Sequence, residues 1–286
     1  MKFSFDQITE LIEMSLKEDS FLDDVTSRSL IDKNYTADVS IISKSEGILS
    51  GIDVLEFVFR KMDPNIVILK KFSDGDKINK SDVIATLNGS LISILSAERT
   101  ALNFIQRMTG ISTITSEYVK LISNYNTKIF DTRKTVPGHR ILDKYSVSIG
   151  GGVNHRKNLS DGILIKDTHI DHLKSKGYSI EKIIDKIKLS IRSNLKIEIE
   201  VESLDDAISA AKSQVDIIML DNMGINLLKE TVKSVRDISK NILIEVSGGV
   251  NKQNVKAISE TGVDIISIGS LTHSVNSHDF SLKFSK

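Results

Sequence analysis

After Asn124, short apolar runs that end in polar residues alternate with longer segments of helical period. The apolar runs predict strands, and the amphipathic segments between them predict helices. The strands are expected at 128–131, 162–166, 196–201, 216–220, 242–246 and 264–268. The main helices are expected at 180–193, 204–213, 225–238 and 252–260. This alternation predicts a parallel sheet, and six strands rather than eight indicate an incomplete α/β barrel.

The chain before Asn124 has a different pattern. Ser4 and Gln7 fit a capping box, and the apolar positions that follow predict a first helix. Short strands and one connecting helix are expected next, at 37–41, 47–51, 53–61 (the helix), 66–69 and 83–85. Helical period returns from Ser96 to Met108, and a separate helix is predicted from Ile114 to Ile122.

This α+β pattern predicts two domains of different class. An N-terminal α+β sandwich domain is expected at 1–112, and an α/β barrel catalytic domain at 113–274. The C-terminal tail, about 275–286, is expected to pack back on the first domain.

The charge balance limits the classes of partner. The chain has 286 residues, with 38 basic and 38 acidic side chains, so its formal net charge is zero. A general nucleic-acid or membrane-surface binder usually has a basic excess, so an anion site here must be a local cluster. The absence of cysteine excludes disulfides, thiolate zinc sites and cysteine nucleophiles. No stretch has the apolar length of a membrane span, and the acidic N-terminus does not resemble a signal peptide, so a cytoplasmic location is expected.

Basic side chains gather in the stretch 128–170, where two apolar runs end abruptly in charge. A predicted turn at Pro137-Gly138 and the run Gly150-Gly151-Gly152 lie between them. Cations at the tips of buried strands favour an anionic ligand, because a buried charge without a partner is costly. The sequence therefore predicts a polyanion site, although a hydrogen-bonded structural role for the histidine remains an alternative. Its basic residues are Arg133, Lys134, His155, Arg156 and Lys166.

Three acids follow on the next two predicted strands. Glu198 and Glu200 are two residues apart, so both face the same side of a strand, which is expected to be the barrel interior. Asp221 ends the following apolar run. Inward carboxylates need cations, a metal or sugar hydroxyls, and such oxygen ligands suit magnesium. An internal salt bridge from Glu198 to Lys166 or Lys196 is the alternative.

Glycine-rich turns follow the last two predicted strands, at Ser247-Gly248-Gly249 and Gly269-Ser270. Such turns can point backbone N–H groups at a phosphate, and the last two strands are where barrels commonly bind one. The sequence contains neither a GxGxxG fingerprint nor a GxxxxGK[ST] loop, so neither nucleotide-binding fold is supported.

The segments DTRKTVPGHR, GGGVNHR and LIKDTHI closely resemble the central motifs of quinolinate phosphoribosyltransferase, the carboxylating nicotinate-nucleotide pyrophosphorylase of NAD synthesis. The resemblance extends along essentially the whole chain. It implies a six-stranded modified barrel, and a reaction in which quinolinate and phosphoribosyl pyrophosphate give nicotinate mononucleotide, pyrophosphate and carbon dioxide, with magnesium. Thr168 and Val136 depart from the family's usual asparagine and threonine, and neither change removes a charge.

The resemblance also implies roles for the candidate residues. Arg99, in a segment similar to the family's AERTALN, would reach the neighbouring subunit's site, which implies a homodimer, alone or within a higher oligomer. Lys134, Glu200 and Asp221 would be catalytic, with magnesium at Glu200 and Asp221. Quinolinate would be bound by Arg99, Arg133, His155, Arg156 and Lys166. Phosphoribosyl pyrophosphate would be bound by Lys134, Glu200, Asp221, Ser247, Gly248, Gly249, Gly269 and Ser270.

Three other functions compete with this one. A Schiff-base aldolase would use Lys166 as its nucleophile, but it would not explain five clustered cations. A relative associated with molybdenum transport shares the fold, but it is expected to lack the intact KDxH and GGGxNHR motifs. A non-catalytic sensor would bind phosphoribosyl pyrophosphate without consuming it.

Overall fold

The computed structural model describes residues 3–190 and 195–284. The chain divides into two compact units, and each is described here by itself. Unit 1 is Met1–Glu117, Lys134–Gly152 and Ser270–Lys286. Unit 2 is Tyr118–Arg133 and Val153–Gly269. None of the described helices combines the length and the apolar character that a membrane span needs.

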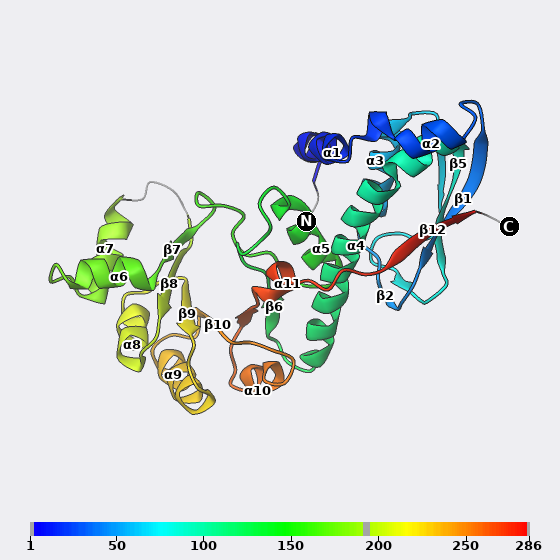
Figure 1. The fold of residues 1–286 in the computed structure, drawn as a ribbon. Coiled ribbons are helices and arrows are strands. Elements are labelled where there is room, and N and C mark those ends of the chain that lie inside the picture. The colour runs from blue at the N-terminus through cyan, green and yellow to red at the C-terminus, as the bar shows by residue number, and fades with distance from the viewer. Residues whose placement is uncertain (1–2, 191–194, 285–286) are drawn as a thin grey trace. The chain divides into compact units, whose positions relative to one another are not determined.

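Unit 1 contains an antiparallel sheet with the strand order β12-β1-β5-β3 (Figure 1). Its strands are β1 (Thr36–Ser43), β3 (Val67–Lys70), β5 (Val83–Ser90) and β12 (Phe280–Phe284), and β2 (Gly47–Ile48) pairs separately with β4 (Lys77–Ile78). Its helices are α1 (Asp6–Glu18), the 3-10 helix η1 (Phe21–Asp23), α2 (Val25–Leu30), α3 (Ile52–Met62), α4 (Leu91–Leu121, which continues into unit 2), α5 (Arg140–Ile149) and α11 (Ser270–His273). The last strand of the chain, β12, lies beside β1, with Val39 opposite Phe284 and Ser43 opposite Phe280.

The core of unit 1 is formed by the apolar faces of α3 and α4 and by the inward side chains of β1 and β5. The spacing of the apolar residues explains why these elements share one core. Apolar residues three or four apart lie on one side of a helix, and those two apart lie on one side of a strand. The fully buried members of this core include Val39, Ile41, Leu55, Val58, Phe59, Ile94, Leu102 and Ile105.

Residues 91–121 form one helix, so the prediction of two helices, one from Ser96 and one from Ile114, was wrong. Polar residues and a glycine in the middle of this segment resembled a break. Their hydroxyls are bonded instead, because Thr115 donates to the Ile111 carbonyl at 2.7 Å and Thr113 accepts from the Ile48 N–H at 3.0 Å. The predicted capping box is also only half present, since Gln7 accepts from the Ser4 N–H but the N-cap of α1 is Phe5.

Unit 2 contains a six-stranded parallel sheet with the order β6-β11-β10-β9-β8-β7. Its strands are β6 (Lys128–Phe130), β7 (Ile163–Ile165), β8 (Ile197–Val201), β9 (Ile217–Asp221), β10 (Leu243–Ser247) and β11 (Ile265–Ser267). Its helices are α6 (Asp167–Lys174), α7 (Ile180–Ser190), α8 (Leu204–Lys212), α9 (Ile225–Ile238) and α10 (Val255–Ser259). The predicted parallel sheet of six strands is therefore confirmed. Positions 191–193 of the predicted helix 180–193 lie outside the described residues.

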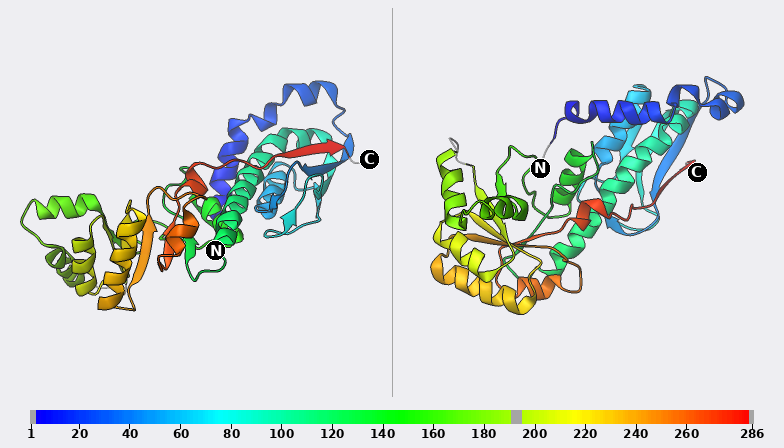
Figure 2. Two further views of the ribbon diagram at one scale, coloured as in Figure 1. Left: turned by 90° about the horizontal axis from the view of Figure 1, so that it is seen from below. Right: turned by 60° about the vertical axis from the view of Figure 1, so that its left-hand side comes forward.

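The two faces of this sheet differ in chemistry. On one face Ile199, Ile218 and Ile244 stand in register and are fully buried. Helix α8 packs against β8 and β9 (Figures 1 and 2). The opposite face, called the carboxylate face below, carries Glu198 and Glu200 of β8, Met219 and Asp221 of β9, Glu245 and Ser247 of β10, and Ser267 of β11. Strict alternation along each strand separates the two sets.

Candidate active site

The carboxyl-terminal ends of β7 to β10 bring several predicted site residues together. Lys166 follows β7, and its Nζ lies 3.5 Å from Oε2 of Glu200 on β8. Asp221 and Ser247, the last residues of β9 and β10, stand opposite each other in register. Burial raises the pKa of Glu200, the charge of nearby Asp221 raises it further, and Lys166 opposes both effects. This end of the carboxylate face therefore holds two mutually repelling acids beside one lysine.

The turn after β10 requires glycine at its first position. Gly248 has φ +86, and a Cβ there would lie 2.2 Å from Oδ1 of Asn222, the residue that follows β9. The Asn222 N–H also donates to the Ser247 carbonyl at 3.1 Å. A Cβ at Gly249 would meet nothing within 4 Å, so open space lies beside this turn.

A second group lies around the segment that follows the glycine run. Asp131 is fully buried and accepts hydrogen bonds from the His155 N–H at 2.9 Å and from Nδ2 of Asn154 at 2.7 Å. His155 accepts the Arg156 N–H on Nδ1 at 2.8 Å, while its Nε2 lies 3.0 Å from Oε2 of Glu198. The alternative interpretation, a salt bridge from Glu198 to Lys166 or Lys196, was therefore wrong: Glu198 contacts His155, and Lys166 contacts Glu200.

Two arginines meet in this second group. Burial lowers the pKa of Arg156, the positive charge of Arg133 lowers it further, and Glu198 opposes the shift. The Nε atom of Arg133 is buried and finds no hydrogen-bond acceptor among the residues that the structure describes. An anion placed between these guanidinium groups would satisfy that donor and relieve the repulsion.

A cavity of about 450 Å³ adjoins this group. His155, Arg156 and Glu198 line it together with Ile163, Ile217, Leu243 and Ile265, the first residues of β7, β9, β10 and β11. The cavity therefore lies toward the amino-terminal ends of these strands, whereas Lys166, Glu200 and Asp221 lie toward the carboxyl-terminal ends. Glu198 and Glu200 connect the two groups along one strand, about 7 Å apart at the usual rise of a strand.

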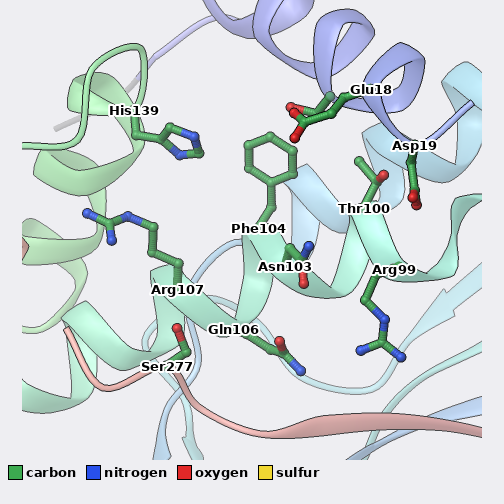
Figure 3. Close-up of a pocket in the computed structure, with 11 residues that line it drawn as sticks. Glu18, Asp19, Arg99, Thr100, Asn103, Phe104, Gln106, Arg107, His139 and Ser277 are labelled. Carbon is green, nitrogen blue, oxygen red and sulfur yellow. The ribbon is translucent and has the colours of Figure 1, made fainter.

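Three predicted residues belong to unit 1. Arg99 projects from α4 and is exposed, with Nη2 3.4 Å from Oε1 of Glu98. It lines a cavity of about 410 Å³ within unit 1 whose walls include α1, α4 and His139 (Figure 3). Lys134 is exposed, and its carbonyl accepts a hydrogen bond from Thr272 at 2.8 Å. Ser270 is the first residue of α11.

Comparison with known proteins decides the family. The model described as "Quinolinate phosphoribosyl transferase, C-terminal domain" matches residues 111–283, and that described as "Quinolinate phosphoribosyl transferase, N-terminal domain" matches residues 24–109. The chain belongs to the quinolinate phosphoribosyltransferase family. It is thus a phosphoribosyltransferase, as its motifs predicted, and the family's reaction transfers a phosphoribosyl group to quinolinate in NAD biosynthesis.

Individual members of the family are similar to this chain over almost its whole length. A Bacillus subtilis protein named "Probable nicotinate-nucleotide pyrophosphorylase [carboxylating]" is 38% identical over 96% of this chain and 93% of its own. A Nicotiana tabacum protein named "Quinolinate phosphoribosyltransferase [decarboxylating] 2b, mitochondrial" is 36% identical over 96% of this chain and 82% of its own. The crystal structure of NadC from Streptococcus pyogenes, 36% identical, superposes with a TM-score of 0.92 and full coverage of both chains.

Several residues of the quinolinate phosphoribosyltransferase chain lie in these sites but were not identified from its sequence. In unit 1, Arg107 makes two hydrogen bonds to Asp143, at 2.9 and 2.8 Å, and His139 stacks on Phe104. Burial lowers the pKa of His139, with Arg107 acting in the same direction and Asp143 opposing it. Only tertiary contacts reveal this group, because each residue taken alone resembles the polar side of a helix or turn.

Glu245 of β10 is the main omission in unit 2. It is fully buried, and its Oε2 lies 3.7 Å from Nε2 of His155. A signal for it existed, because a glutamate interrupts the apolar run Ile242–Val246 and alternates with Ser247. The alternation that placed Glu198 and Glu200 on one face places Glu245 and Ser247 on the same face.

Proposed function

We propose that this chain forms nicotinate mononucleotide from quinolinate and phosphoribosyl pyrophosphate on the carboxylate face of unit 2, releasing pyrophosphate and carbon dioxide. The observation that carries the proposal is the pair of charged groups on this face. One is rich in arginine, and the other combines a lysine, two acids and glycine turns. A dicarboxylate and a sugar phosphate are the ligands that these two groups match.

The arginine-rich group would bind quinolinate. Arg133 stands close enough to Arg156 that its charge, after burial, lowers the pKa of Arg156, and Arg133 has a buried donor to satisfy. Lys166 would approach the substrate from the end of β7, and Arg99 would come from the neighbouring subunit of a homodimer. His155 borders this subsite, and its Nδ1 accepts the Arg156 N–H, which holds the Arg156 backbone in place.

The ends of β8 to β11 would bind phosphoribosyl pyrophosphate. Glu200 and Asp221 would meet the ribose hydroxyls, and Lys134 would meet the pyrophosphate. The open space beside Gly249 favours a phosphate there. The full set for the 5′-phosphate is Ser247, Gly248, Gly249, Gly269 and Ser270.

Glu200 and Asp221 fit a magnesium ion, because burial and the charge of Asp221 raise the pKa of Glu200 and a bound cation would offset both effects. When bound, magnesium would neutralise the pyrophosphate oxygens. As pyrophosphate departs, positive charge develops on the anomeric carbon, and the carboxylates of Glu200 and Asp221 stabilise it while Lys134 offsets the leaving group's charge. The pyridine nitrogen of quinolinate donates its electron pair to that carbon. The adjacent carboxylate then leaves as carbon dioxide, its bonding electrons passing into the positively charged ring, and a proton replaces it.

The architecture proposed for this site is the incomplete six-stranded barrel, in a catalytic domain at 113–274. The division of the sheet into an apolar face and a polar face supports it, because barrel strands alternate between the packed outside and the lumen. β6 and β7 are the edge strands, and within the described residues no pairing joins them. Val153 adds one parallel bridge to β6 at Phe130.

The test is a direct assay. The purified protein is incubated with quinolinate, phosphoribosyl pyrophosphate and magnesium, and nicotinate mononucleotide and carbon dioxide are followed. Formation of both is expected, with nicotinate a poor substitute for quinolinate. Preference for nicotinate would reassign the reaction. Binding of phosphoribosyl pyrophosphate without turnover would indicate a sensor, and a borohydride-trapped adduct on Lys166 would indicate an aldolase.

A further inference from the structure

The carboxyl group of Glu245 lies in the middle of the carboxylate face with no role in the reaction described above. Its side chain is fully buried, and neither oxygen has a hydrogen-bond donor among the described residues. Glu198 is also buried, and the two carboxyl groups and Nε2 of His155 lie within 4.8 Å of one another. Two buried carboxylates at this separation repel strongly, and among the described residues neither oxygen of Glu245 nor Oε1 of Glu198 has a hydrogen-bond donor.

The hydrogen-bond partners of His155 indicate which nitrogen of its ring carries the proton. Its Nδ1 accepts the Arg156 N–H, so Nδ1 carries no proton and the neutral ring holds its proton on Nε2. Nε2–H then points at Glu198, 3.0 Å away, with Glu245 at 3.7 Å. This tautomer also argues against a metal ion among the three side chains, because a metal would need the lone pair of Nε2 and would force a proton onto Nδ1, opposite another N–H.

We infer that Glu245 is a positioning residue that acts in its protonated form, donating its O–H to the ionised Glu198, which accepts Nε2–H of His155 and thereby holds Arg156 in place. In this arrangement Glu245 donates, Glu198 accepts on both oxygens, and His155 donates from Nε2 and accepts on Nδ1. A deprotonated Glu245 would put a second negative charge beside Nε2 and remove the donor to Glu198. The His155 ring would then lose its fixed orientation, and so would the Arg156 backbone that is bonded to it.

The surroundings of Glu245 favour its neutral form. Burial and the charge of Glu198 together raise the pKa of Glu245 to about 8, and His155 only partly offsets these effects. Its register neighbours on β9 and β11 are Met219 and Ile265, which carry no charge. One strand further on each side lie Glu200 of β8 and Lys128 of β6.

The activity test compares Glu245→Gln, which keeps a donor and cannot ionise, with the unchanged chain. Glu230→Gln, the same change on the exposed face of α9, is the matched control. This readout rests on the proposed function. The values of kcat and of KM for quinolinate are measured separately from pH 6 to 9.5. Near pH 6.5 Glu245→Gln should stay within about threefold of the unchanged chain. Above pH 8 the unchanged chain and Glu230→Gln should lose kcat/KM, mainly through KM, by up to about tenfold per pH unit relative to Glu245→Gln.

An identical alkaline decline in all three proteins, or a hundredfold loss by folded Glu245→Gln at pH 6.5, would overturn the inference. A second measurement needs no catalysis: long-range ¹⁵N–¹H NMR of the His155 ring in the unchanged chain at pH 7. A neutral Nε2–H tautomer is expected, and an imidazolium or an Nδ1–H tautomer would overturn the inference. If no protein consumes quinolinate, the proposed function fails while the NMR result still decides the role of Glu245.

Discussion

At the scale of single residues, neighbours decide chemistry more than residue type does. His155 was expected to be one of five cations around an anion, yet it bonds on both ring nitrogens within the protein. Glu198 and Glu200 were correctly expected to share a face, because alternation along a strand is local. Their partners could not be predicted, because His155 and Lys166 reach them from distant parts of the chain.

Replacement of Lys134 should lower the turnover number strongly. Its exposed side chain is proposed to offset the charge of departing pyrophosphate, so Lys134→Ala should keep the fold and lose about a hundredfold to a thousandfold in kcat. Steady-state kinetics with quinolinate and phosphoribosyl pyrophosphate measure the loss, and Lys229→Ala on the exposed side of α9 is the control. Near-normal turnover in Lys134→Ala would remove this lysine from the mechanism.

Glu245 should also make stability depend on pH. Its pKa is raised in the folded chain, so the folded state binds more protons than the unfolded state between the ordinary pKa of 4.5 and about 8. This contribution is fully present below pH 4.5 and is lost as pH rises through 8. The free energy of unfolding, measured by urea denaturation at pH 5, 7 and 8.5, should therefore fall less steeply with pH in Glu245→Gln than in the unchanged chain. Parallel curves for the two proteins would contradict the assignment.

At the scale of elements, periodicity predicted the sheet of unit 2 well, and helix ends less well. All six strands lie where apolar runs end in polar residues, since such runs are local signals. The prediction of a break within α4 was wrong, because the polar side chains there form hydrogen bonds with β2 and the residues next to it. Thr113 accepts from Ile48, and Thr109 donates to the Ser50 carbonyl at 3.1 Å. Such partners lie some sixty positions away in sequence, beyond any local pattern.

Gly110 should resist replacement although it lies inside α4. An interior glycine normally lowers helix stability by roughly 1 kcal/mol relative to alanine, so Gly110→Ala would ordinarily stabilise the helix. Here a Cβ would lie 2.4 Å from the Asn276 carbonyl oxygen, and the backbone of Asn276 would have to move to remove the clash, which costs free energy. We expect a net loss of about 1–3 kcal/mol in the free energy of unfolding. Denaturant melting measures it, with Ser116→Ala in the same helix as a control that should lie near zero. A stabilised Gly110→Ala would show that the Asn276 segment moves freely.

Asp74 should anchor the start of α3. Its carboxylate accepts the Gly51 and Ile52 N–H groups, both at 2.9 Å, and the Tyr145 hydroxyl at 2.7 Å. Asp74→Ala leaves these buried donors unsatisfied and should cost about 1–3 kcal/mol of unfolding free energy. Asp76→Ala, in the same turn, removes one exposed bond to the Ser73 N–H and should cost less. Equal losses in the two variants would mean that Asp74 does not cap the helix.

At the scale of the whole molecule, long-range pairing limits what a sequence can tell. The six strands of unit 2 follow the order of the chain from β7 to β11, with β6 at the far edge. In unit 1, by contrast, β12 joins β1 across almost the full length of the chain. No periodicity encodes such a pairing, because the apolar alternation of β12 fits any open sheet edge.

The proposed sharing of active sites between two copies can be tested by mixing inactive variants. Arg99 and Lys134 would serve the same reaction from different subunits, so Arg99→Ala and Lys134→Ala should each be nearly inactive alone. In a mixed dimer one site carries both changes and the other carries neither. With random pairing, half of the dimers are mixed and each has one intact site, so the mixture should recover about a quarter of normal activity after unfolding and refolding together. Mixing without subunit exchange is the control. Full inactivity of the refolded mixture, with dimers present by light scattering, would place Arg99 and Lys134 in the site of one subunit.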